Sequence, residues 1–269
     1  MKILLVADVH NRPHGSRYTL WSLKRIFNKL RPELIVFLGD TVHGPAVKKN
    51  YEKYLRQVLD LTGDIPFATV FGNHDDECDT SKEEILKIIS SYKNSLTNGR
   101  DYLIEMNGEA LLFIDSGTYY DGDESLYDIV KPEQIDFALS KIKGKKAILF
   151  QHIIIPDIME CIDVFEQKEK GAIRDGKKYY RFKDNIIYTG KLGECPCPPS
   201  IKTNQLEALA PYLKGMCFGH DHKNTFELMM NDVKIIQCGG CGSNSYDKLC
   251  RSNVKLLDTK TMTTQIYYI

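Results

Sequence analysis

Residues 67–75 read FATVFGNHD, an apolar run that ends in a glycine and three polar side chains. The run from Phe67 to Phe71 predicts a buried strand. Gly72 allows the chain to turn sharply out of that strand, because glycine tolerates backbone conformations that other residues avoid. Asn73 and His74 then place an amide oxygen beside an imidazole at a strand's carboxyl end, where open α/β sheets bind their ligands.

The residues before this stretch alternate between strand and helix patterns. Two near-continuous apolar runs, 2–7 and 34–38, predict buried strands. Residues 16–30 and 51–61 carry apolar side chains at helical spacing and predict amphipathic helices. A strand-helix-strand-helix-strand order implies right-handed crossovers and a parallel core.

The rest of the chain predicts three more helices and a second set of strands. Helices are expected at 81–92 and 131–142 and from 202 or 203 to 213. Residues 102–106 and 110–115 predict a hairpin whose turn contains Asn107-Gly108. Further strands are expected at 147–150, 215–218, 225–230, 233–237, 253–258 and 264–268. One α/β domain over residues 1–269, built on two sheets, fits this pattern best.

Residues 156–203 are the least regular part of the sequence. They contain many charges together with repeated glycine and proline. Loops of this length inside a compact chain are usually functional. We therefore expect a lid or insertion over the active site.

Composition limits the classes of partner. The 269 residues include 36 basic and 36 acidic side chains, so the net charge is zero and gives no bulk attraction to nucleic acid or anionic membranes. No apolar run approaches the roughly 20 residues that a transmembrane helix needs. Asp8 interrupts the first apolar run too early for a secretory signal. These features predict a soluble, cytoplasmic protein with no membrane partner and argue against a nuclease.

Eight cysteines are scattered through the chain without a regular disulfide pattern, so reduced thiols are expected. Two close pairs stand out, namely Cys195 with Cys197 and Cys238 with Cys241. A structural zinc site built from these pairs stays open as an alternative.

Five clusters of metal-type donors each follow a predicted strand, and five of the seven histidines fall within them. Mixed carboxylate, amide and imidazole donors suit manganese, iron or zinc. Two such ions about 3.5–4 Å apart can clamp the attacking and leaving oxygens of a phosphoryl displacement. The clusters are Asp8-Val9-His10, Gly39-Asp40, Gly72-Asn73-His74, Gln151-His152 and Gly219-His220-Asp221-His222.

The ordered series D-x-H, G-D, G-N-H-D, H and G-H-x-H resembles the calcineurin-like metallophosphoesterase family. The resemblance covers residues 3 to about 258 and is nearest to the single-domain branch related to purple acid phosphatases. It implies a four-layer α/β/β/α sandwich with two mixed β-sheets. It also implies two divalent or trivalent metal ions (Mn, Fe or Zn) held by seven ligands. These are Asp8, His10 and His222 for the first ion, Asn73, His152 and His220 for the second, and Asp40 as the bridge.

The same resemblance implies that His74 protonates the leaving group or stabilises the transition state. Asp75 would orient His74 or, alternatively, cap the following helix. His43 departs from the purple acid phosphatases, which carry a tyrosine three residues after the bridging aspartate. An iron–tyrosinate colour is therefore not expected. His43 and Arg12 are candidates for touching the substrate, although an exposed loop position is the simpler reading of both.

The resulting expectation is a dinuclear phosphohydrolase that cleaves phosphate esters by attack of a metal-bridging hydroxide. The sequence leaves monoester and diester substrates open. A small phosphate ester is favoured as the partner, and a phosphoprotein stays open. The rival readings are a non-catalytic scaffold on the same fold and a nuclease. The oligomeric state is not determined by the sequence.

Overall fold

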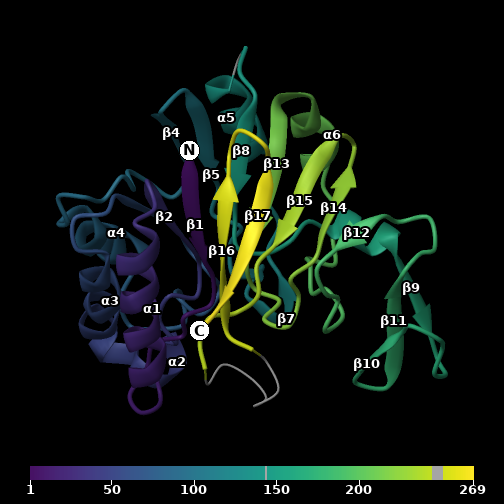
Figure 1. Cartoon of the computed structure of the whole chain (residues 1–269), viewed down its shortest axis with the longest axis horizontal. Helices are drawn as coiled ribbons and strands as arrows, with labels where there is room; N and C mark the ends of the chain where they lie inside the picture. Colours follow the sequence, from purple (N-terminus) through teal and green to yellow (C-terminus); the bar gives the residue numbers. More distant parts are fainter. Residues whose placement is uncertain (143, 244–250) are drawn as a thin grey trace.

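The protein contains two large mixed β-sheets, as the computed structural model of residues 1–142, 144–243 and 251–269 shows (Figure 1). The five-stranded sheet has parallel β1–β2 and β2–β3 pairs, while β16 and β17 add to it antiparallel. The parallel core predicted for the first part of the chain is confirmed. In spatial order this sheet contains β17 (Thr263–Tyr268), β16 (Asn253–Asp258), β1 (Lys2–Val6), β2 (Leu34–Leu38) and β3 (Phe67–Val70).

The second sheet has seven strands and a parallel centre. Its edge hairpin turns at Asn107 and Gly108, whose φ angles of 52° and 79° lie in the left-handed region that such two-residue turns require. The hairpin prediction is confirmed, although Glu109 belongs to the second strand. In spatial order the sheet contains β12 (Tyr188–Thr189), β14 (Glu227–Met230), β15 (Val233–Gln237), β13 (Leu213–Phe218), β8 (Ala147–Phe150), β5 (Glu109–Phe113) and β4 (Tyr102–Met106).

Helices cover the outer face of each sheet. The helices α1 (Arg17–Leu30), α2 (Gly44–Val47), α3 (Tyr51–Leu59) and α4 (Lys82–Ser90) lie on the five-stranded sheet (Figure 1). The helices α5 (Pro132–Lys141) and α6 (Gln205–Leu209) lie on the seven-stranded sheet. Short 3₁₀ turns occupy Lys48–Asn50, Asp60–Thr62, Pro156–Cys161 and Ala210–Tyr212. None of the described helices is both long and apolar enough to cross a membrane.

Alternate residues of β1 show how the layers pack. Leu4 and Val6 face the helices, whereas Ile3 and Leu5 face the other sheet and share a core with Phe113 and its neighbours. Side chains on successive strand residues point to opposite faces, so a strand buried on both sides reads as a continuous apolar run. The four-layer α/β/β/α sandwich is therefore observed as predicted.

Besides the two-residue edge strand β12, two groups of strands were not expected from the sequence. One is the hairpin of β6 (Tyr119–Tyr120) and β7 (Asp123–Tyr127). The other is a three-stranded sheet of β9 (Ile162–Phe165), β10 (Ile173–Asp175) and β11 (Lys178–Phe182), which lies to one side of the main sandwich (Figure 1). No strand was expected within 156–203, and the strands there were missed because they are short, partly exposed and rich in charge. A lid function for the segment stays a prediction.

Candidate metal centre

The donor clusters lie where strands of both sheets end, and the backbone there is bent in an unusual way. Asp8, His10, Asp40 and His220 have φ angles of 54°, 46°, 50° and 72°. Such left-handed conformations cost about 1–3 kcal/mol each in non-glycine residues and persist where the surroundings enforce them. Here the loops after β1 and β2 bond to each other, with the His10 amide donating to the Asp40 carbonyl at 2.9 Å. The bends turn the side chains toward one another.

Each of the two buried aspartates is fixed by one carboxylate oxygen and presents the other to imidazoles. The Oδ1 atom of Asp40 accepts the backbone N–H of His74 at 2.9 Å, and Oδ2 of Asp8 accepts that of His220 at 3.0 Å. Oδ2 of Asp40 then lies 3.4 Å from Nε2 of both His10 and His152. Oδ1 of Asp8 lies 3.1 Å from Nε2 of His222. One oxygen of each carboxylate thus faces the imidazole nitrogens of the centre.

His152 has its tautomer set by the backbone. Its Nδ1 lies 2.6 Å from the Leu38 carbonyl oxygen, which can only accept, so Nδ1 carries the hydrogen. Nε2 is therefore the ring nitrogen that faces Asp40 and the Asn73 Oδ1 atom, which is 3.3 Å away. A ring N–H bonded to a carbonyl is the usual way in which proteins orient a metal-binding histidine.

The donor atoms form two groups that share Asp40. In each group the candidate ligand atoms lie within 4.8 Å of one another. All seven predicted ligands are brought together, since Asn73 joins the second group through His152. The Nε2 atoms of His10 and His222 are only 3.1 Å apart, so both belong to one donor group. This donor set fits two metal ions, and coordination itself stays a prediction. The groups are Asp8, His10, Asp40 and His222, and Asp40, His152 and His220.

The electrostatics of the centre keep its carboxylates ionised but affect its imidazoles differently. Burial raises the pKa of the Asp40 carboxyl, but the nearby His152 and other imidazoles outweigh it and hold that pKa well below its usual value. Burial also raises the pKa of Asp8, and His222 and His10 bring it below its usual value. Burial lowers the pKa of His152, but the charge of Asp40 outweighs burial and raises that pKa to about 10. Asp8 likewise outweighs burial at His222 and raises its pKa above the usual value. The pKa of His220 falls to about 3 because of burial and the neighbouring His152. Ionised carboxylates and a neutral imidazole are the forms that bind metals.

Glycines allow these groups to approach so closely. A Cβ atom on Gly72 would lie 2.1 Å from Oδ1 of Asp40. Gly39 has a φ of 84°, and a Cβ there would lie 2.4 Å from Nδ1 of His152. The turn that Gly72 makes possible is therefore only part of its role, because it also leaves space for the shared carboxylate.

Asp75 does not act as predicted. Its carboxylate accepts hydrogen bonds from the Tyr51 hydroxyl at 2.6 Å and from the amides of Gly72 and Val42. Burial and the charge of Asp40 raise its pKa to about 6. Its hydrogen bonds to Tyr51, Gly72 and Val42 do not include the His74 ring, so it does not orient His74. The helix that follows, α4, has Ser81 as its N-cap, so Asp75 does not cap it.

Glu77 is the carboxylate that contacts His74. Its Oε2 atom lies 2.5 Å from Nδ1 of His74. Asp75 does not contact the His74 ring, because adjacent residues of this turn point in different directions. Residues three apart, such as His74 and Glu77, point the same way. Spacing in a turn was the only signal that could have suggested Glu77 from the sequence.

A third group of ring nitrogens, from His10, His43 and His74, also lies within 4.8 Å. Nδ1 of His43 is 3.3 Å from Nδ1 of His10. Sequence reasoning left His43 outside the predicted site, although its position three residues after Asp40 pointed there. The structure places it against a predicted ligand.

The alternative zinc site built from cysteines has no support in the described residues. The potential metal groups found there contain no cysteine, and seven cysteines are free thiols. Cys238 and Cys241 are buried, whereas Cys197 is exposed and its amide donates to the Asp221 carboxylate. Cys250 lies outside the described residues.

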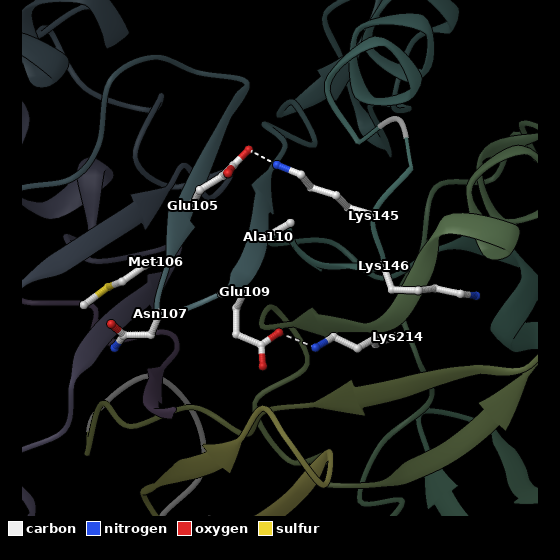
Figure 2. Close-up of a pocket in the computed structure, with 9 residues that line it drawn as sticks. Glu105, Met106, Asn107, Glu109, Ala110, Lys145, Lys146 and Lys214 are labelled. Atoms are coloured by element: carbon white, nitrogen blue, oxygen red, sulfur yellow. Dashed lines mark hydrogen bonds and ion pairs between the residues drawn. The ribbon is translucent and has the colours of Figure 1, made fainter.

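A separate hollow of about 550 Å³ lies at the amino ends of β5, β8 and β13, away from the strand ends that carry the centre (Figure 2). Four of the five charged side chains that line it form ion pairs with one another. Lys145 contacts Glu105, and Lys214 contacts Glu109 (Figure 2). Because these lysines and glutamates neutralise each other, the hollow does not present a converging donor set.

Comparisons with known proteins agree with this geometry. The sequence profile of the calcineurin-like phosphoesterases matches residues 1–224. Two proteins of Arabidopsis thaliana are similar to the chain. The "Probable inactive purple acid phosphatase 14" is 23% identical, with 84% of this chain and 63% of that protein covered. The "Probable inactive purple acid phosphatase 28" is 30% identical, with 84% and 62% covered. The chain thus spans less than two thirds of either relative.

Among solved structures, a dimetal phosphatase from Danio rerio superimposes with a TM-score of 0.58 at 13% sequence identity. The match covers 89% of this chain and 87% of that one. At this identity the likeness establishes the fold alone, and it is the fold that carries the strand-end donors described above.

Proposed function

Because the chain belongs to the calcineurin-like phosphoesterase family, we propose that it is a metal-dependent phosphohydrolase that cleaves phosphate esters. The observation that carries this proposal is the position of Asp40. Its carboxylate belongs to both groups of donors, and Oδ2 lies 3.4 Å from an imidazole of each. A shared carboxylate is what two closely spaced cations require, because it offsets their repulsion.

The residues divide between two ions. Asp8, His10 and His222 would hold one, Asn73, His152 and His220 would hold the other, and Asp40 would lie between them. Such a pair supplies a nucleophile made from water and stabilises the negative charge of the phosphoryl group. Manganese, iron and zinc all accept this mixture of oxygen and nitrogen donors.

His74 serves the leaving group. When the ester bond between phosphorus and oxygen breaks, the electron pair stays with the alcohol oxygen, which then takes the Nε2 proton of the imidazolium form of His74 and leaves a neutral imidazole. The His74 side chain is 28% exposed, whereas that of Asp40 is 1% exposed. The proton donor is therefore reachable from outside, while the shared ligand is not.

A small phosphate ester is the substrate that we favour, and a phosphoprotein is the alternative. The balanced charge of the chain argues against nucleic acid, whose backbone is bound largely by excess basic residues. A steep fall of oligonucleotide binding with rising salt would revive a nuclease reading.

Metal analysis combined with assays against mono- and bis-(4-nitrophenyl) phosphate tests the proposal. We expect about two tightly bound ions per chain, since two ions are needed for the clamp. Asn73→Ala should abolish most of the turnover and lower the metal content. Failure to hydrolyse either ester with manganese, iron and zinc supplied would contradict the proposal.

The printed names of both Arabidopsis relatives include "inactive", which favours a second candidate function, a non-catalytic scaffold. The same assay separates the two. A scaffold would keep its fold and could bind metal, yet show no turnover of either ester. The presence here of every donor residue and of His74 favours catalysis.

A further inference from the structure

Glu77 fixes the orientation of His74. Its Oε2 atom lies 2.5 Å from Nδ1, and a carboxylate oxygen accepts, so Nδ1 must carry a hydrogen. The other ring nitrogen, Nε2, is then the one left for the substrate. The hydrogen bond that one ring nitrogen of a histidine makes determines the role of the other nitrogen, so the Glu77 contact at Nδ1 assigns the substrate side of His74 to Nε2.

Glu77 is itself held from its other side. Its Oε1 atom accepts a hydrogen bond from the Tyr119 hydroxyl of β6. Both oxygens are thus engaged, and the carboxylate cannot swing away without breaking one of the two bonds. The neighbouring pair in the same two segments, Thr118 and Asp76, is also bonded, at 3.0 Å.

The β6–β7 hairpin reaches the other half of the centre as well. The Tyr127 ring meets the His220 ring edge-on, with centroids 4.5 Å apart. Tyr119 and Tyr127 stack with an interplanar angle of 17° and centroids 6.0 Å apart. One short hairpin therefore contacts Glu77, which orients the proton donor, and His220, a predicted metal ligand.

We propose that Glu77 and Tyr119 are positioning residues that hold His74 for proton transfer, and that the β6–β7 hairpin sets its place relative to the metal ligands. The kinetic part of this inference rests on the proposed function. It also narrows the substrate class. A fixed proton donor matters for esters of weakly acidic alcohols, whose alkoxides leave poorly without a proton.

The kinetic test compares phenyl phosphate with 4-nitrophenyl phosphate, or the matching diesters, because nitrophenolate leaves readily without a proton. Glu77→Gln should lower kcat at least about tenfold for the phenyl ester and by about twofold or less for the nitrophenyl ester, in line with general-acid contributions of 10²–10⁴. Tyr119→Phe should act in the same direction with about a threefold effect, since one supporting bond is lost. Metal content should not change.

Asp76→Asn is the matched control. It removes the negative charge of the adjacent carboxylate, keeps an oxygen that can accept from Thr118, and leaves the His74–Glu77 contact. The inference is overturned if Glu77→Gln slows both esters equally, or if Asp76→Asn reproduces its ester-dependent effect.

Nuclear magnetic resonance of the metal-free protein tests the contact without any turnover. A strongly deshielded Nδ1 proton of His74 should be present in the wild type and in Asp76→Asn. In Glu77→Gln its signal should move upfield or be lost, because a neutral amide oxygen is a weaker acceptor than a carboxylate. If that proton is unchanged in Glu77→Gln, the positioning role is wrong. If the proton behaves as expected but no ester is hydrolysed, the proposed function fails and the contact stands.

Discussion

The candidate metal centre and the cluster around Glu227 both bury carboxylates, but they neutralise them differently. Glu227 on β14 contacts the amine of the fully buried Lys255 at 2.8 Å and the amine of the partly exposed Lys234 at 2.9 Å. The chain thus supplies its own permanent cations there. Asp8 and Asp40 instead face imidazoles, whose lone pairs can also bind a metal.

The partners of a buried carboxylate indicate whether it belongs to a ligand-binding site or to the packed interior. A buried carboxylate paired with lysines has its charge neutralised without any ligand. Here that pair links a strand of one sheet to a strand of the other. A buried carboxylate surrounded by imidazoles is suited to an added cation, because the carboxylate oxygens and the imidazole nitrogens can bind the same metal ion. Burial of charge alone does not distinguish the two cases, whereas the type of partner does.

The largest effect is expected from Asp40→Ala, which removes the carboxylate shared by the two groups. We expect kcat to fall by about a thousandfold or more, since metal ions contribute several kcal/mol to transition-state stabilisation. The metal content, measured by mass spectrometry, should fall for both ions. Asp60→Ala, at an exposed carboxylate that contacts Tyr92, is the control. Retention of both ions would show that Asp40 is not shared.

Glu227→Gln should affect stability and spare activity. Loss of the charge leaves the buried Lys255 amine without its counterion, which typically costs about 3–5 kcal/mol. Urea unfolding at neutral pH should show this loss, while the kcat of the folded variant stays at the wild-type value. Glu52→Gln, in an exposed pair with Arg56, should change the free energy of unfolding by less than about 1 kcal/mol. A large loss of kcat in Glu227→Gln would erase the distinction between the two regions.

The same variant has a predictable pH dependence. Burial raises the pKa of Glu227, but Lys255 and the other partners outweigh burial, so the net pKa lies below its usual value of 4.5. A depressed pKa stabilises the folded state above the usual value, and this stability is lost as the pH falls through the lowered pKa. The difference in unfolding free energy between wild type and Glu227→Gln should therefore be largest near neutral pH and shrink in acid.

Gly72→Ala tests the geometry of the centre without removing any donor. The added methyl would lie 2.1 Å from Oδ1 of Asp40 and must displace that carboxylate. A displacement of about 1 Å at a catalytic centre can cost about a hundredfold in rate. Gly99→Ala is the control, because its Cβ would meet its nearest neighbour at 3.4 Å. If both variants kept full activity, the close approach of Gly72 to Asp40 would not matter for function.

The sequence predicted that the candidate donors lie together because each follows an apolar strand directly. A strand end fixes where the next two or three residues lie, so Asp8, Asp40 and His152 could be placed without knowing the loops. Glu77 and Tyr119 could not be found in this way. Their contact joins residues 42 positions apart and depends on a hairpin whose two- and five-residue strands carry no clear alternation. The role predicted for Asp75 was wrong because two consecutive residues of this turn point their side chains in different directions.

The smallest effect is expected at His43, on the more open side of the centre. If His10 uses Nε2 toward the shared carboxylate, its Nδ1 carries a hydrogen and donates to Nδ1 of His43, 3.3 Å away. Partners of this kind typically contribute 10–100-fold to metal affinity, and at a partly exposed ring we expect about tenfold. His43→Phe should therefore weaken metal binding, measured by competition with a chelator, while His43→Gln retains an acceptor and should recover part of the loss. Equal affinities in the two variants would show that the ring contributes shape and not a hydrogen bond.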